Sequence, residues 1–107
     1  MASIGGMGNL LKQAQEMQAR MAKIQEELGQ KTVEGSAGGG MVQVTVNGQF
    51  NLVAVKIEPS VINNNEKEML EDLILAAVND GMRKARDLVS TEMGKLTGGF
   101  KIPGLMP

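Results

Sequence analysis

The sequence of 107 residues contains no cysteine, histidine, tryptophan or tyrosine, and only two phenylalanines. The missing thiols exclude disulfides, thiolate metal sites and a cysteine nucleophile. The missing imidazoles remove the commonest general base and metal ligand. An enzyme built from the remaining residue types would depend on carboxylates, lysine, serine and threonine. We therefore expect no enzymatic activity, no metal site, no cofactor and no small-molecule substrate.

Long apolar runs are also missing. The longest, residues 73–78, is far shorter than the roughly 20 residues that a helix needs to cross a bilayer. Residues 1–9 carry no basic segment followed by an apolar stretch, so the sequence does not indicate a signal peptide. These features predict a cytoplasmic protein with no membrane contact, and the length suits a single domain over residues 1–107.

The first pattern present is that of an amphipathic helix. Asn9 is a suitable N-cap, and Gly29 is a suitable residue to end the helix. Between them, apolar residues recur at alternating spacings of four and three, a narrow stripe that suits one partner helix. We expect residues 1–8, ahead of the cap, to be flexible. The stripe consists of Leu10, Ala14, Met17, Met21, Ile24 and Leu28.

The middle of the chain changes to an alternating pattern, which predicts strands over residues 31–36, 41–46 and 49–58. Short connections between successive strands favour an antiparallel meander. The alternation places three valines on one face of the second strand, and these are candidate core residues: Val42, Val44 and Val46.

The connections between these strands carry turn signals. Asn47-Gly48 predicts a tight hairpin in which both residues take positive φ. Apolar residues change phase near Leu52, which indicates a β-bulge there. Residues 35–38 match the GxxG pattern of a nucleotide-clamping loop, but that loop joins two helices. Here the segment lies between strands, so an ordinary turn, over residues 37–40, is the favoured interpretation.

The last pattern predicts a second helix of about 30 residues, roughly 46 Å long. Asn65 and Glu68 have the spacing of a capping box. Acidic residues precede basic ones along the segment, an order that complements the helix dipole. Gly98-Gly99 ends the helix, and we expect residues 98–107 to form a flexible tail.

The predicted fold is therefore α+β, with the order α-β-β-β-α, a three-stranded antiparallel sheet and long protruding helices. A compact domain of this length has a radius of gyration of about 13 Å, so the second helix must extend beyond it. The sheet also has two open edges, which proteins usually cover or pair. Association of two copies solves both problems, and we expect a homodimer.

Charge is unevenly distributed along the chain. The net charge is +1 over residues 1–31, −5 over residues 32–80 and +3 over residues 81–107. The basic residues at the two ends of the chain have two explanations. The ordinary one is a solvated helix surface, and the functional one is contact with DNA phosphates. Because aromatic residues are scarce, we do not expect sequence-specific recognition of single strands by stacking, and we expect duplex backbone contact with weak base preference.

Methionines offer a different hypothesis. Four of them lie on or beside the apolar stripes, and methionine-rich surfaces can bind varied peptides. The alternative function is therefore a protein-interaction module with a methionine-lined cleft between helical arms. The methionines concerned are Met17, Met21, Met69 and Met82.

Ordered sequence blocks at residues 6–17, 33–38, 42–48, 56–60, 70–73, 76–80 and 98–103 resemble the YbaB/EbfC family of bacterial nucleoid-associated proteins. The resemblance implies a cytoplasmic, tweezer-like homodimer that binds duplex DNA, associates with the nucleoid, alters DNA organisation and can thereby affect gene expression. It also implies that DNA-binding residues lie on the first and last helices. The matching cations are Lys12, Arg20, Lys23, Arg83, Lys84, Arg86 and Lys95.

Overall fold

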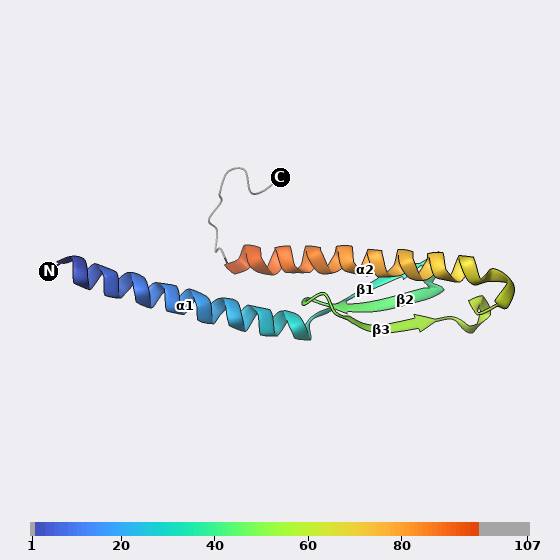
Figure 1. Cartoon of the computed structure of the whole chain (residues 1–107), viewed down its shortest axis with the longest axis horizontal. Coiled ribbons are helices and arrows are strands. Elements are labelled where there is room, and N and C mark those ends of the chain that lie inside the picture. Colours follow the sequence, from blue (N-terminus) through green and yellow to red (C-terminus); the bar gives the residue numbers. More distant parts are fainter. Residues whose placement is uncertain (1, 97–107) are drawn as a thin grey trace, which may run out of the picture.

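The computed structural model describes the backbone of residues 2–96 and the side chains of residues 6–95. Three antiparallel strands in the order β1-β2-β3 separate two long helices, which confirms the predicted α+β fold (Figure 1). The elements are α1 Ala2–Gln30, β1 Thr32–Ala37, β2 Val42–Asn47, β3 Leu52–Ile57 and α2 Lys67–Leu96.

The chain is elongated, with extents of 77 × 27 × 17 Å. Its radius of gyration is 20.7 Å, compared with about 13 Å for a compact domain of this length. The first part of helix α2 lies along the sheet (Figure 1). Helix α1 runs antiparallel to α2, and its N-terminal part extends past the C-terminal end of α2; we call helix α1 the arm. Both predicted long helices are therefore present, and both extend beyond the strands, α1 further than α2 (Figure 1).

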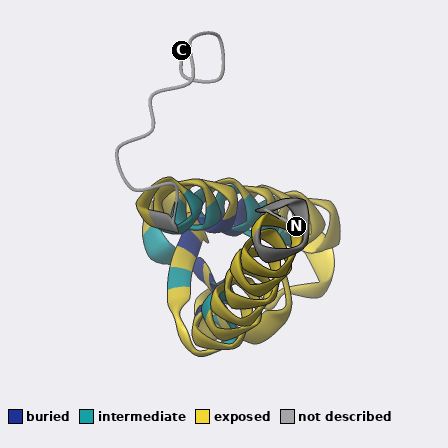
Figure 2. Ribbon diagram, turned by 90° about the vertical axis from the view of Figure 1, so that its left-hand side faces the viewer, coloured by how far each residue is buried: buried dark blue, intermediate teal, exposed yellow. Residues whose placement is uncertain are grey.

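The core lies between α2 and the first two strands. The alternating valines of β2 are buried, as predicted, and pack against Ala77 and Ala85 of α2. Figure 2 shows these buried positions where the sheet faces α2, while nearly all of α1 is exposed. Within the described residues, valine is the largest fully buried side chain, so the core is thin.

Two glycines allow α2 to approach the sheet closely. Gly35 is buried in β1, and a Cβ added there would overlap the backbone of Ala77 and Gly81. A Cβ on Gly81 would lie 2.9 Å from a methyl group of Val46 and 3.0 Å from one of Val44. No larger residue fits at either position without separating the helix from the sheet.

Gly35 lies in the first strand, within the range predicted for that strand, and not in the turn that follows it. Gly35 pairs with Val44 inside the β-ladder. The turn itself is confined to Gly38–Gly40, where all three glycines have positive φ. The run of glycines in the sequence does not separate the packing role of Gly35 from the turn role of Gly38–Gly40, because turns and close backbone approach both favour glycine.

The predicted start of the first helix is wrong. Helix α1 begins at Ala2, so residues 2–8, expected to be flexible, are helical. Asn9 lies inside the helix, where asparagine costs less than about 1 kcal/mol relative to alanine and does not end a helix. Ahead of α2, the capping residue is Asn63 rather than Asn65: its side chain accepts a hydrogen bond from the Asn65 amide at 3.1 Å and caps the short 3-10 helix Asn64–Glu66 that leads into α2. The tail predicted over residues 98–107 lies outside the described residues.

The predicted two-residue hairpin turn is also wrong. The loop spans four residues, and positive φ occurs at Phe50 (63°) rather than at Asn47 and Gly48. The Asn47 side chain stabilises this loop by accepting hydrogen bonds from the amides of Gln49 and Asn51 at 2.9 and 3.0 Å.

The predicted bulge near Leu52 is confirmed. Val46 pairs with Leu52 and Thr45 with Ala54, which leaves Val53 as the extra residue of β3. Because a bulge changes the phase of alternation, Leu52 and Val55 both lie on the face that carries the core valines.

We predict that Gly35→Ala destabilises the fold by about 3 kcal/mol or more, because the methyl group meets helix backbone that cannot rotate away. Chemical denaturation followed by circular dichroism measures this change. Gly94→Ala is the matched control on α2, where an added Cβ meets no atom within 4 Å, and we expect it to raise stability by up to about 1 kcal/mol. Equal stabilities for Gly35→Ala and the original chain would contradict the proposed close approach.

Candidate nucleic-acid interface

The arm is anchored at its C-terminal end by the β2–β3 loop. The Gly48 amide donates to the Leu28 carbonyl at 2.8 Å, and the Gln49 side chain donates to the Gln25 carbonyl at 3.0 Å. A Cβ at Gly48 would lie 2.6 Å from the Leu28 oxygen, so glycine is required for this contact. The first five turns of α1 therefore project from a fixed base, with their side chains exposed from residue 6 onward.

A salt bridge joins the base of the arm to α2. Lys31 Nζ lies 2.7 Å from Glu92 Oε1, and Lys95 Nζ lies 3.3 Å from the same oxygen. The hydrogen bond from Lys31 is the main reason why the pKa of Glu92 is lowered from its ordinary value of 4.5, and Lys95 adds to the effect. This acidic side chain therefore stays ionised and holds two cations close together.

An open groove between the two helices brings three of the seven predicted cations together. Arg20 and Lys23 line it from α1, and Lys95 lines it from α2. The groove has a volume of about 340 Å³, and Ile24, Glu27 and Glu92 complete its wall. Lys12 lies three turns before Lys23 on the arm, outside this groove.

Arg83 and Lys84 lie elsewhere, where α2 crosses β1. Both contact Asp80, with Arg83 Nη2 at 2.8 Å and Lys84 Nζ at 3.4 Å from its oxygens. Lys84 also donates to the Glu34 carbonyl at 3.0 Å, and the Ser36 amide donates to Asp80 at 3.0 Å. These two cations therefore hold the helix on the sheet.

The hydrogen bond from the Ser36 amide is the largest cause of a lowered pKa at Asp80, and the hydrogen bond from Arg83 comes next. Together with Lys84, they lower the pKa of this carboxyl from 3.8 to about 2 despite its partial burial. Asp80 therefore carries a full negative charge under ordinary conditions.

Four of the predicted cations make no ion pair within residues 6–95. Three of them lie on the arm and one on α2, and they are Lys12, Arg20, Lys23 and Arg86. Helical geometry places the three arm cations within an arc of about 80°. Glu16 and Glu27 share that arc, so the face is mixed in charge.

Sequence reasoning missed the contact of Lys31 with α2, because it counted this residue as the start of a strand rather than as the end of the arm.

Within one chain, the four methionines do not gather at one place. Met17 and Met21 are exposed on the arm, Met69 lies at the start of α2, and Met82 packs against the core. No pocket described for the chain is lined by more than one of the four. The hypothesis of a methionine-lined protein-binding module therefore has no support from the geometry.

Other site types have no structural basis in the described residues. No group of three or more histidine, cysteine, aspartate or glutamate side chains is placed to hold a metal ion there. Neither long helix includes a stretch that is apolar enough, over a sufficient length, to traverse a membrane.

Comparison with known proteins identifies relatives over nearly the whole chain. Residues 4–100 match the model of the YbaB/EbfC DNA-binding family. The chain is 57% identical over 99 residues to nucleoid-associated protein DP1429 of Desulfotalea psychrophila, covering 92% of this chain and 93% of that one. It is 54% identical over 99 residues to nucleoid-associated protein TTE0040 of Caldanaerobacter subterraneus, covering 92% and 89%.

A solved structure shares the fold. The crystal structure of uncharacterized protein HP0035 from Helicobacter pylori aligns with a TM-score of 0.71 and 26% sequence identity. The alignment covers 86% of this chain and 94% of the other. The α-β-β-β-α arrangement is therefore found in an experimental structure.

The lowered pKa of Asp80 predicts how stability depends on pH. A carboxyl whose pKa is lower in the folded chain stabilises the fold above its unfolded pKa of about 4, and this contribution is lost as the pH falls towards 2. We expect Asp80→Asn to be less stable than the original chain at neutral pH, with the difference shrinking between about pH 4 and 2. Urea denaturation at several pH values measures this difference.

Asp87→Asn is the control, because Asp87 is three-quarters exposed and lies 3.8 Å from Arg83. Its stability should follow that of the original chain at every pH. A constant difference between Asp80→Asn and the original chain across the acid range would contradict the role assigned to Asp80.

Proposed function

The chain belongs to the YbaB/EbfC DNA-binding family, a class of nucleoid-associated proteins rather than enzymes, and we propose that it binds duplex DNA as a homodimer. In this proposal it acts in the nucleoid, contacts mainly the sugar–phosphate backbone and alters DNA conformation and organisation. The observation that carries the proposal is the row of cations without ion-pair partners on the projecting arm.

The dimensions of the arm suit a duplex. Eleven residues separate Lys12 from Lys23, which corresponds to about 16 Å along the helix. The major groove is about 12 Å wide, so cations at this spacing can contact phosphates on both of its sides. Each neutralised phosphate releases condensed counterions, which favours binding without selecting a base sequence.

The seven predicted cations contribute unequally in this proposal. Lys12, Arg20 and Lys23 are the primary phosphate contacts, and Lys95, which shares Glu92 with Lys31, adds a weaker contact across the groove. Arg86 adds a further cation on α2. Arg83 and Lys84 already neutralise Asp80, so they add less to the field that DNA experiences.

An uncovered apolar strip supports the homodimer. Leu52 and Val55 pair with buried Val46 and Val44, so they share the core face of the sheet, yet they are 44% and 45% exposed. Helix α2 packs on β1 and β2 and leaves this strip open. The chain exposes 8096 Å², compared with about 5,800 Å² for a compact monomer of its mass. A second copy covering β3 would bury the strip and pair the open sheet edge.

Dimerisation explains how contacts with the DNA backbone would change the shape of a duplex. Two copies related by symmetry present two arms, and each cation is then present twice. A duplex held at two separated places can be bent or bridged, and sequence-dependent deformability then modulates the affinity.

Salt dependence tests the backbone contact. If a dimer neutralises about six phosphates, log affinity should fall with log salt at a slope near −5. Replacing both Arg20 and Lys23 with glutamine removes four cations from a dimer, so the slope should weaken by up to about 3.6. A mobility-shift titration across salt concentrations measures both values.

Two matched variants complete this test. Lys56→Gln with Lys67→Gln removes the same charge from the outer sheet face and the far end of α2, and it should leave the slope unchanged. Glu16→Gln removes an acid from the cationic arc and should raise the affinity. Identical slopes for the two double variants would contradict the proposal that the arm contacts phosphates. An affinity that does not change with salt would contradict binding through the DNA backbone.

The dimer proposal has its own test. Val55→Glu places a charge on the strip, and we expect dimer affinity to fall at least about a hundredfold, or about 2.7 kcal/mol. Ala54→Glu adds the same charge one residue away on the opposite face, and it should dissociate like the original chain. Sedimentation equilibrium measures both constants. A monomeric original chain at micromolar concentration would rule the homodimer out.

A further inference from the structure

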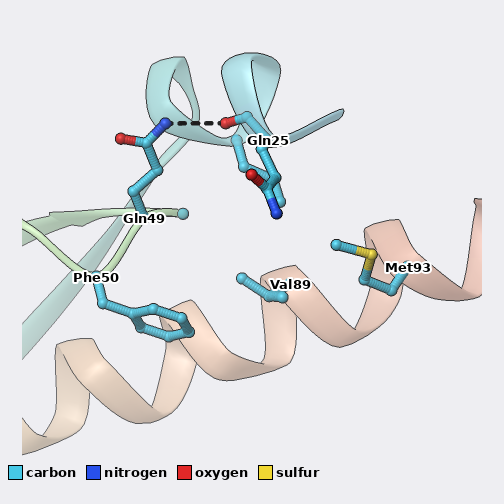
Figure 3. Close-up of a pocket in the computed structure, with 7 residues that line it drawn as sticks. Gln25, Gln49, Phe50, Val89 and Met93 are labelled. Carbon is cyan, nitrogen blue, oxygen red and sulfur yellow. Dashed lines mark hydrogen bonds between the residues drawn. The ribbon is translucent and has the colours of Figure 1, made fainter. Parts of the chain in front are cut away.

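A pocket at the base of the arm goes beyond the DNA-binding proposal. It lies where α1, the β2–β3 loop and α2 meet, and its volume is about 250 Å³. Figure 3 shows Val89 and Met93 rising from α2 towards the loop, with the Phe50 ring beside them. The hydrogen bond between Gln49 and Gln25 closes the opposite wall. The lining residues are Gln25, Leu28, Gly48, Gln49, Phe50, Val89 and Met93.

The inner surface of this pocket is mainly apolar and only partly covered. Leu28 is buried, whereas the Phe50 side chain is 44% exposed. Phe50 is the only aromatic residue in the described part of the chain. Phe50 has a φ of 63°, a conformation that costs a non-glycine residue about 1–2 kcal/mol. The exposed ring therefore leaves apolar surface at the edge of the pocket that a further apolar side chain would cover.

The size of the pocket suits an aromatic ring. An apolar cavity of about 150 Å³ is large enough for benzene. A volume of about 250 Å³ therefore accommodates a phenylalanine side chain, with room for adjustment of the flexible Met93.

The segment that follows α2 carries such a ring. Residues 97–107 lie outside the described part of the chain and include Phe100, Ile102, Leu105 and Met106, with no acidic residue. Phe100 is the only other aromatic residue of the sequence. Gly98 and Gly99 stand between it and the helix end, and two glycines readily allow a chain to reverse direction.

The distances allow this segment to reach the pocket. Met93 lies three residues before the helix end at Leu96, or about 4.5 Å along the axis, and Val89 lies about 10 Å from that end. Four residues beyond Leu96 span up to about 14 Å. A tethered ring this close has an effective concentration of the order of millimolar, which favours it over a separate ligand.

We propose that Phe100 of the same chain folds back into this pocket and packs against Phe50, Val89 and Met93. The docked ring joins the two long helices and the hairpin loop at the one place where all three meet. It thereby stiffens the base of the arm, where the described contacts between α1 and α2 are few.

The unusual composition of the chain makes a direct test possible. Because histidine, tyrosine and tryptophan are absent, every aromatic proton in a nuclear magnetic resonance spectrum belongs to Phe50 or Phe100. We expect nuclear Overhauser effects from the Phe100 ring to the Met93 methyl group and to the Phe50 ring. We also expect an upfield ring-current shift of the Met93 methyl resonance. The full chain is used, without any substitution.

Variants and mixed labelling complete the experiment. Phe100→Ala should remove the Phe100 contribution to the Met93 shift, whereas Lys101→Ala should retain it, and Met17 serves as a methyl control on the arm. Absence of contacts between the Phe100 ring and the pocket would overturn the proposal. So would contacts that appear only between differently labelled chains, since they would place the ring in a partner's pocket. Neither result would affect the DNA-binding proposal, which salt titration tests separately.

Discussion

The close approach of α2 to the sheet at Gly35 and Gly81 is the constraint on which the rest of the structure depends. It places Asp80 within hydrogen-bonding distance of the Ser36 amide and Lys84 within reach of the Glu34 carbonyl. These contacts fix the position of α2 along β1. The position of α2 in turn determines where Glu92 meets Lys31, and so where the arm begins.

This packing divides the cations between two tasks. Those near the middle of α2 neutralise Asp80 and hold the helix on the sheet, so their charge is already balanced. Those on the arm face solvent because α1 makes almost no contact with the body before Ile24. A net charge of −1 is therefore compatible with phosphate binding, because the distribution of unpaired charge matters more than the sum.

Sequence reasoning identified both long helices and all three strands because hydrophobic period depends on local structure. It failed where the determining contact was tertiary. The need for glycine at position 35 was not predicted, because the helix backbone that requires it belongs to residues more than forty positions later. The hairpin loop departed from the Asn-Gly rule because Gly48 hydrogen-bonds to Leu28 on α1. Arg83 and Lys84 have the helical spacing to pair with Asp80, so these ion pairs could be predicted. The contacts of Asp80 and Lys84 with β1 could not, because they depend on how α2 is positioned along the sheet.

The thin core explains why this architecture needs more than one packing partner. With valine as the largest fully buried side chain in the described residues, the interface between α2 and the sheet buries limited apolar area. The arm adds little, since most helical stability in proteins comes from packing of an apolar face, and α1 is almost fully exposed before Ile24. Whatever contacts the arm must therefore also order it. Phosphates along a duplex would do both, because they neutralise the cations and hold them at the spacing that the helix provides. In the proposed mechanism, binding and rigidity of the arm would be one equilibrium, and the proposed filling of the pocket at its base would shift that equilibrium in the absence of DNA.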